Sequence, residues 1–385
     1  MSTVDHRSGV HNLGHPLAAP IDGEPGPYSV FRPCRAIGGA ILPVPMESYA
    51  AFQPNNEDPD KSFVVGVVDT GLVLDSDRQP HPWLAGHVAF DPEHDDDPLA
   101  FNGKLRSDDG HGTFVTGLVL REAPRAYVRA IRGMDRDLFG DPDRPTPAEL
   151  RAADSRVAGA IYRLLDPAEE LSAPASIINL SFYGVFPEAE PPILIRDAIQ
   201  AASDAGVVVI VAAGNQPRRE LVWPAAFARD SSLRNMHVVG AVDETVCRTE
   251  IDLPFVATFS NHQEWVRTYA NGAYVNGPLY SAELIYNPAD RPELHDFFLP
   301  AKSPAAGPTP ATYAGWAKWS GTSFAAATVS GIIAARAMAD RSISVAQVAD
   351  QVLRPNAPID GTDVEGLVCY VQGVDSDWPS RPPSA

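Results

Sequence analysis

The chain has 385 residues, of which 44% are hydrophobic, so it can bury one large core with room for insertions. Its 49 acidic and 30 basic residues give a formal net charge of −19, which disfavours nucleic acid and anionic membranes as partners. The three cysteines, Cys34, Cys247 and Cys369, are an odd, low count that favours free thiols in a reducing compartment. The polar N-terminus lacks the apolar stretch of a secretory signal, and no apolar run has the length of a membrane span. The sequence therefore predicts a cytoplasmic protein.

The first part of the chain, residues 1–60, is an extension rich in proline and glycine. Residues 36–46 are its only apolar stretch. We expect this extension to be an arm packed on the protein surface. The alternative interpretation is a segment that lies across a cleft of the domain that follows.

A continuous apolar run, residues 63–68, predicts a strand buried on both faces, as in a parallel sheet. Asp69 follows at the point where the chain turns through Thr70 and Gly71. Ligands of open α/β sheets bind outside the carboxyl ends of the strands, so an aspartate there can orient a histidine. A strand-end aspartate that caps its own turn is the simpler alternative.

The next segments are acidic and then glycine-rich. Residues 91–97 carry closely spaced carboxylates, but their spacing is not that of an EF-hand calcium loop, and we expect a solvated loop. Alternatively, this run lies at the rim of a cleft and attracts basic residues of a substrate. His111 then lies between Gly110 and Gly112, ahead of an apolar stretch that predicts a buried helix. A histidine held at a helix start, in a chain that also offers Asp69, is a candidate general base.

Strands and helices alternate along the rest of the chain, as a doubly wound parallel sheet requires. Capping boxes predict helix starts after Thr146 and Ser344. The chain after Pro355 is rich in glycine, aspartate and proline and predicts an irregular tail. Two further strands and one further helix are expected at Tyr127–Arg132, Met236–Val242 and residues 192–203, respectively.

Two more segments carry candidate chemistry. The apolar run that begins at Gly206 predicts another buried strand, which ends at Gly214 and Asn215. Residues 321–323, Gly-Thr-Ser, precede an alanine-rich run, so the hydroxyl of Ser323 is expected at the amino end of a buried helix. The free N–H groups and the positive dipole end found there favour a nearby negative charge. Taken alone, this segment is also typical of an ordinary N-cap.

Together, these segments resemble the motifs of the subtilisin-like serine proteases, the subtilases. The motifs are Val-Val-Asp-Thr-Gly at Asp69, His-Gly-Thr at His111 and Ser-Gly-Thr-Ser-Phe-Ala at Ser323, in the order Asp, His, Ser that is known for this family. The strands ending at Asn215 and Ser181 also look like family segments. The resemblance covers roughly residues 61–350. It implies a subtilisin-like, doubly wound α/β fold of three layers with a mostly parallel central sheet.

The resemblance also implies roles for single residues. Ser323 would be the nucleophile, His111 the general base and then acid, and Asp69 the group that orients the imidazole. The Asn215 side chain and the Ser323 backbone N–H would hold the oxyanion. The substrate would bind along the strands that contain Ser181, Phe182, Tyr183, Ala213 and Gly214.

The sequence departs from the family pattern in four places. Ala327 and Thr328 replace a proline and a histidine that usually follow the nucleophile, and Tyr183 replaces a glycine that lines the substrate strand, where its side chain would narrow a subsite. The segment after the His111 helix lacks the loop that holds calcium in many relatives. We therefore expect no cofactor and no metal at the usual family site. The stretch between Ser260 and Ser323 is longer than usual, which indicates an insertion at about residues 274–312.

We thus expect a catalytic domain at residues 61–355 between the extension and a tail at residues 356–385. The predicted activity is that of a serine endopeptidase with a peptide or protein substrate and a restricted, processing type of specificity. Broad intracellular degradation is the alternative, followed by a catalytically silent binding module and by acyl transfer or peptide ligation. The insertion is expected to be a loop with aromatic anchors at the rim of the cleft, unless it packs remotely; its aromatic and apolar residues are Tyr274, Tyr280, Tyr286, Phe297, Phe298 and Leu299.

Overall fold

The computed structural model describes eleven stretches of the chain. They are residues 29–33, 42–43, 55–97, 110–134, 145–167, 173–188, 190–215, 221–244, 255–286, 311–356 and 369–373, with only the backbone described for 29–33, 42–43, 280–286 and 311–314. Phe297, Phe298 and Leu299, which the sequence analysis singled out, lie outside these stretches.

A parallel sheet of eight strands forms the centre of the molecule. Its strand order is β13-β10-β9-β8-β6-β3-β5-β4, and all seven neighbouring pairs run parallel. Apolar runs that are buried on both faces form its middle strands, as this kind of sheet requires. The strands are β3 (Val64–Asp69), β4 (Val88–Ala89), β5 (Tyr127–Arg132), β6 (Ala175–Leu180), β8 (Val208–Ala212), β9 (Met236–Val242), β10 (Thr268–Asn271) and β13 (Cys369–Val371).

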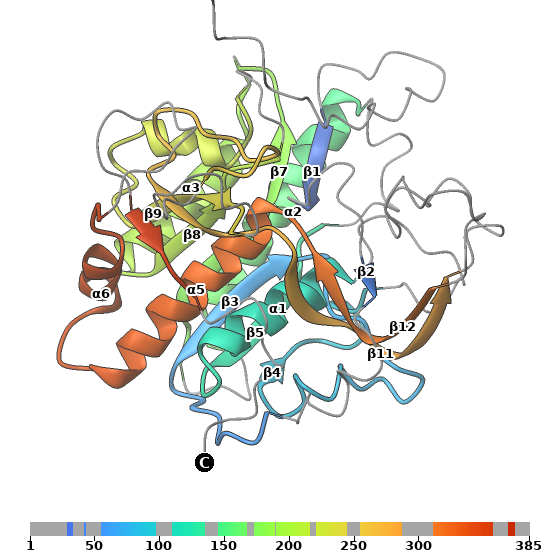
Figure 1. Cartoon of the computed structure of the whole chain (residues 1–385). Coiled ribbons are helices and arrows are strands. Elements are labelled where there is room, and N and C mark those ends of the chain that lie inside the picture. Colours follow the sequence, from blue (N-terminus) through green and yellow to red (C-terminus); the bar gives the residue numbers. More distant parts are fainter. Residues whose placement is uncertain are drawn as a thin grey trace, which may run out of the picture.

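Helices cover both faces of this sheet, which gives the three layers that we expected (Figure 1). Helices α1 (His111–Glu122) and α5 (Thr322–Ala339) pack against each other in one layer, and α2 (Pro147–Leu165) and α3 (Ile193–Asp204) pack against each other in the other. Two short helices, η4 (Ala225–Arg229) and α6 (Val345–Val352), complete the set that the structure describes. The α/β fold class predicted from the sequence is confirmed.

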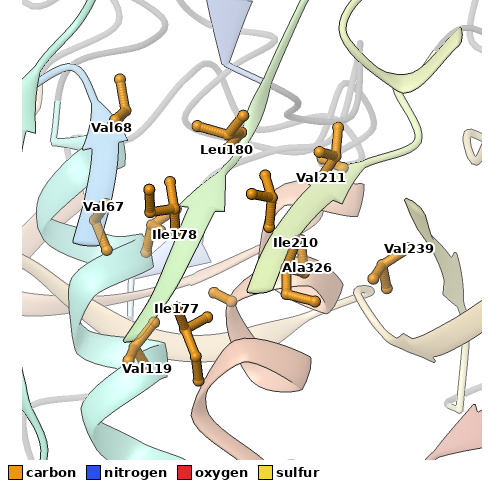
Figure 2. Close-up of a cluster of buried hydrophobic side chains, with 14 of the residues drawn as sticks. Val67, Val68, Val119, Ile177, Ile178, Leu180, Ile210, Val211, Val239 and Ala326 are labelled. Carbon is orange, nitrogen blue, oxygen red and sulfur yellow. The ribbon is translucent and has the colours of Figure 1, made fainter. Parts of the chain in front are cut away.

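The main core lies between the sheet and the layer of α1 and α5. Figure 2 shows Ile177, Ile178 and Ile210 on neighbouring strands, with Val119 of α1 and Ala326 of α5 close to them. Helix α5 is long and apolar enough to span a membrane, with a mean hydropathy of 1.3, but 72% of it is buried inside the molecule. Small alanine side chains let this helix lie close to the sheet, so its hydropathy is that of a core helix.

Two smaller antiparallel sheets flank the central one. Strand β1 (Ser29–Pro33) of the N-terminal extension pairs with β7 (Phe182–Val185), which follows the central strand β6. The other small sheet has the order β11-β12-β2 and contains β11 (Val275–Tyr286), β12 (Ala311–Trp319) and β2 (Leu42–Pro43). Strand β12 runs almost directly into α5, and hence into Ser323.

Most local predictions agree with the structure. Strands β5 and β9 have the expected bounds, and capping boxes at Thr146 and Ser344 begin α2 and α6. Two expectations were wrong. The expected irregular tail contains β13, which extends the sheet edge by pairing with β10. The described ends of the insertion form the paired strands β11 and β12 rather than a loop, because backbone pairing across the hairpin satisfies their N–H and C=O groups.

Candidate active site

Asp69 and His111 meet at the carboxyl end of β3. Asp69 is the last residue of β3, and His111 is the first residue of α1. His111 Nδ1 lies 2.7 Å from Asp69 Oδ1, and both side chains are almost fully buried. The backbone N–H of Thr70 donates to the same carboxylate oxygen at 2.8 Å. The second ring nitrogen of His111, Nε2, has no hydrogen-bond partner among the described residues.

The start of α1 is fixed from outside the helix. Its N-cap residue, Gly110, has a φ of 78° and carries no side chain that could cap the helix. Asp97 Oδ2 accepts a hydrogen bond from the Gly110 N–H at 3.0 Å, and Thr70 Oγ1 accepts one from the Gly112 N–H at 3.0 Å. A Cβ atom on Gly112 would lie 2.2 Å from the carbonyl oxygen of Gly71. Glycine at this position is therefore what allows the helix start, and with it His111, to approach the end of β3.

The acidic run at residues 91–97 is only partly a solvated loop, so that expectation was wrong in part. Asp95 and Asp97 are 1% and 6% exposed. Asp95 accepts hydrogen bonds from Arg163 Nη2 at 3.1 Å and from the Arg132 backbone N–H at 3.0 Å. Burial raises the pKa of the Asp97 carboxyl to about 6, although the bond from the Gly110 N–H acts in the opposite direction. Both carboxylates are buried because internal donors replace the water that they lose.

Two aromatic rings pack directly against the imidazole, and a third supports them. The His111 ring lies 5.5 Å from Trp319, nearly perpendicular to it, and 5.5 Å from Phe324. Phe114 packs against both Trp319 and Phe324. These contacts exclude water from the His111 side chain and leave it little freedom to rotate.

Ser323 lies at the amino end of α5, where its backbone N–H has no acceptor within the helix. Its hydroxyl donates to the carbonyl oxygen of Ser181 at 2.7 Å, and the Ser181 hydroxyl donates back to the Ser323 carbonyl oxygen at 3.1 Å. Asn179 Nδ2 in turn donates to the Ser181 hydroxyl at 2.7 Å. In this structure, therefore, the Ser323 hydroxyl bonds to the strand beside it and not to His111.

Asn215 also faces the start of α5. Its Oδ1 accepts a hydrogen bond from the backbone N–H of Thr322 at 2.9 Å, which fixes the orientation of the side-chain amide. Its Nδ2 is buried and has no partner among the described residues. An unpaired buried donor is costly unless something binds to it. The amide N–H group of Asn215 and the backbone N–H of Ser323 thus belong to the same end of α5, as an oxyanion site needs.

The residues expected to bind substrate fall into two groups. Phe182 and Tyr183 begin β7, and Ser181 lies directly before them. Strand β1 already pairs with the edge of β7, with Pro33 opposite Phe182 and Arg32 opposite Tyr183. The side chains of Phe182 and Tyr183 are 0% and 5% exposed. The described parts of the N-terminal extension thus pair with the domain at two strand edges, β1 with β7 and β2 with β12.

Ala213 and Gly214 form the second group, and their backbone groups are already bonded within the protein. The Ala213 N–H donates to Val239 O, and its carbonyl accepts from Asn261 Nδ2 at 2.8 Å. The Gly214 N–H donates to Thr322 Oγ1 at 3.1 Å, and its carbonyl accepts from the Asn261 N–H. These two residues can contact a substrate through their surfaces but have few backbone hydrogen bonds left to offer.

Sequence reasoning missed the residues that support these groups. Thr70, Asp97, Trp319, Thr322 and Asn261 fix the positions of Asp69, His111, Ser323 and Asn215. The sequence could have indicated Thr70 and Thr322, because each is next to a motif residue. Asp97 and Asn261 contact their partners only through the fold and leave no local signal.

Comparisons with known proteins agree with these motifs. Residues 60–364 match the model of the subtilase family. A thermophilic serine proteinase of Bacillus sp. (strain AK1) is 27% identical over 241 residues, which cover 59% of this chain and 48% of the relative. Subtilisin-like protease 1 of Pseudogymnoascus destructans is 25% identical over 217 residues, which cover 55% of this chain and 43% of the relative. The chain therefore spans about half the length of these curated relatives, or less.

Two solved structures share the fold. The prenylagaramide maturation protease PagA has a TM-score of 0.51 at 19% sequence identity, and the match covers 85% of this chain and 94% of that chain. The patellamide maturation protease PatA has a TM-score of 0.50 at 20% identity, and the match covers 82% of this chain and 95% of that chain. Sequence identities this low establish a common fold and nothing finer.

The first prediction concerns Asp69, His111 and Ser323. Replacing each with alanine should remove nearly all hydrolysis of a peptide amide, because the three groups act as one unit. For the same reason, double variants should lose little more than the worst single variant. The measurement is kcat/KM on a peptide library with the folded state checked by circular dichroism. Near-normal turnover by folded Ser323→Ala would contradict the assignment.

The second prediction concerns Asn215. Asn215→Ala should lower kcat by about 10²–10³-fold with little change in KM, because the hydrogen bond to an oxyanion forms fully only in the transition state. Steady-state kinetics on one peptide substrate would measure both constants. A change in KM alone would instead assign Asn215 to ground-state binding.

Proposed function

Because the chain belongs to the subtilase family, we propose that it is a serine endopeptidase that cleaves peptide bonds through an acyl-enzyme on Ser323. One observation carries the proposal above all others. Asp69 and His111 form a buried pair at 2.7 Å, and the pair leaves His111 Nε2 without a partner among the described residues. A neutral imidazole bound to a carboxylate through Nδ1 has Nε2 free to accept a proton.

In the first half of the reaction, Ser323 would lose its hydroxyl proton to His111 Nε2 as its oxygen attacks the scissile carbonyl carbon. This step requires the hydroxyl to leave the Ser181 carbonyl and turn toward the imidazole. Asp69 would stabilise the imidazolium and hold its tautomer. His111 would then give the proton to the leaving amine, and the C–N bond breaks to leave an ester on Ser323.

The oxyanion of the tetrahedral intermediate would lie at the amino end of α5. The Asn215 Nδ2 group and the Ser323 backbone N–H are its proposed donors. Donors that are already in place cost no reorganisation when the charge develops. In the second half, water attacks the ester carbon and gives its proton to His111, and Ser323 is released when the proton returns to its oxygen.

We further propose a restricted, processing type of specificity for a peptide or protein partner. The two solved structures with the same fold are named maturation proteases, which supports this direction by analogy of fold alone. The hairpin of β11 and β12 supports it too, because it runs directly into the nucleophile and adds structure near the site. Broad degradation remains the alternative and would show as cleavage at many unrelated sequences.

A catalytically silent binding module is the second candidate, and one observation favours it. The Ser323 hydroxyl bonds to the Ser181 carbonyl rather than to His111. The Nε2 atom of His111, which has no partner among the described residues, favours an active enzyme instead. We therefore propose an enzyme rather than a silent module, and we propose that it is cytoplasmic. A reagent that reacts with activated serines distinguishes the two candidates. The single cysteine whose placement is described, Cys369, is a buried free thiol, which suits the proposed reducing compartment.

The third prediction tests the activity itself. A fluorophosphonate probe should label the wild-type protein and fail to label Ser323→Ala, since only an activated serine attacks the probe. A diverse peptide library should then give cleavage at a narrow set of sequences. Ser342→Ala is the control variant, because Ser342 follows the carboxyl end of the same helix and, among the described residues, bonds only to Asp340. Absence of labelling in folded wild-type protein would favour the silent module.

The fourth prediction concerns β1, which occupies the edge of β7. A peptide that pairs with this edge has to displace β1, so we propose that the N-terminal segment competes with substrate. Removal of residues 1–35 should raise kcat/KM for short peptides, mainly through a lower KM. A synthetic peptide of residues 25–37 added to the truncated protein should inhibit it competitively. Unchanged kinetics after truncation would mean that substrate does not use the β7 edge.

A further inference from the structure

Tyr274 is held in an unfavourable backbone conformation next to the candidate site. Its φ is 53°, a left-handed value that non-glycine residues rarely adopt, and among the described residues only Arg78 shares this property. Its side chain is 45% exposed, so burial of the ring does not offset the strain. Strained backbone conformations of this kind cluster at functional sites, so the conformation of Tyr274 suggests a function at this position.

The turn that carries Tyr274 is fastened to the residues just before Ser323. The Tyr274 N–H donates to Ser320 Oγ at 2.9 Å, and the Gly321 N–H donates to the Gly272 carbonyl at 2.8 Å. A Cβ atom on Gly272 would lie 2.7 Å from the Gly321 carbonyl oxygen, so the two segments touch. The position of the Tyr274 backbone is therefore fixed relative to the nucleophile.

The strand pairing determines which half of a peptide would reach Tyr274. β1 pairs antiparallel with β7, so that Ser29 lies opposite Val185 and Pro33 lies opposite Phe182. A peptide in the same orientation approaches Ser181 and Ser323 with increasing residue number. Residues before the scissile bond then lie along β7, and residues after it continue past Ser323.

Tyr274 directly precedes the hairpin of β11 and β12, whereas β7 begins directly after Ser181. Ser323 contacts Ser181 through its hydroxyl, whereas Ser320 contacts Tyr274. In Figure 1, the amino end of α5 is accordingly found between β7 and the hairpin of β11 and β12. The exposed ring of Tyr274 is thus available to the part of a peptide that follows the scissile bond.

We propose that Tyr274 is a specificity-determining residue that contacts the leaving half of the substrate and selects an apolar or aromatic side chain just after the scissile bond. The inference rests on the proposed endopeptidase function. Aromatic rings give a large contact area for apolar groups at a low cost in side-chain entropy. The Ser320 hydroxyl holds the backbone of Tyr274, and the strained turn directs the ring outward.

The test compares two substrates that share the residues before the scissile bond. One is a peptide with phenylalanine directly after the bond, and the other is the same peptide with glycine there. Tyr274→Ala should lower kcat/KM for the phenylalanine peptide about tenfold more than for the glycine peptide, since the lost contact belongs to the side chain in the leaving half. Tyr274→Phe should retain most of the preference.

Two further variants separate specificity from folding. Tyr162→Ala is the matched control, because Tyr162 is equally exposed at 44% but lies on α2, and it should change neither rate. Tyr274→Asn places a residue that tolerates positive φ at the turn, so it should keep or raise the melting temperature while losing the preference. Equal losses on both substrates, or no loss on either, would overturn the proposal. A wild-type protein that cleaves no member of the diverse peptide library would instead contradict the proposed function.

Discussion

The buried contact between Asp69 and His111 is the interaction on which the site depends. It requires the end of a strand and the start of a helix to come within van der Waals distance, and side chains larger than hydrogen at residue 112 would prevent this. The approach also exposes the first N–H groups of α1 to a dry environment, where unpaired donors are costly. The side chains of Asp97 and Thr70 accept hydrogen bonds from two N–H groups at this helix start, so they stabilise the position of His111 as well as the helix.

The second half of the site is assembled by the same means at α5. The start of this helix is bonded to the strand ends on its two sides, through Ser323 to Ser181 and through Thr322 to Asn215. These bonds connect parts of the chain that are distant in sequence, and the one to Asn215 uses the Thr322 N–H, a backbone group that the helix end leaves unpaired. Donor groups therefore converge on one point at the carboxyl edge of the sheet, where bound ligands of open α/β folds are found.

The features that the sequence predicted depend on interactions between residues close in the chain. The features that it missed depend on contacts between distant segments. The bounds of β5 and the capping boxes at Thr146 and Ser344 depend on neighbouring residues, so local patterns were sufficient. The candidate residues were likewise found through short motifs. Strand β13 is only three residues long and exists because β10 offers a free edge, and the burial of Asp97 depends on a donor from α1. Such features become visible only when distant segments are brought together.

The hairpin of β11 and β12 is part of the site rather than an addition to its surface. Trp316 on β12 packs against His81 and Trp83, which fixes the strand to the domain near its end. Three residues later, Trp319 contacts the His111 ring and is followed directly by the turn into α5. A displacement of β12 would consequently move the aromatic contacts of the His111 ring and the start of α5 together, because one continuous piece of backbone carries both.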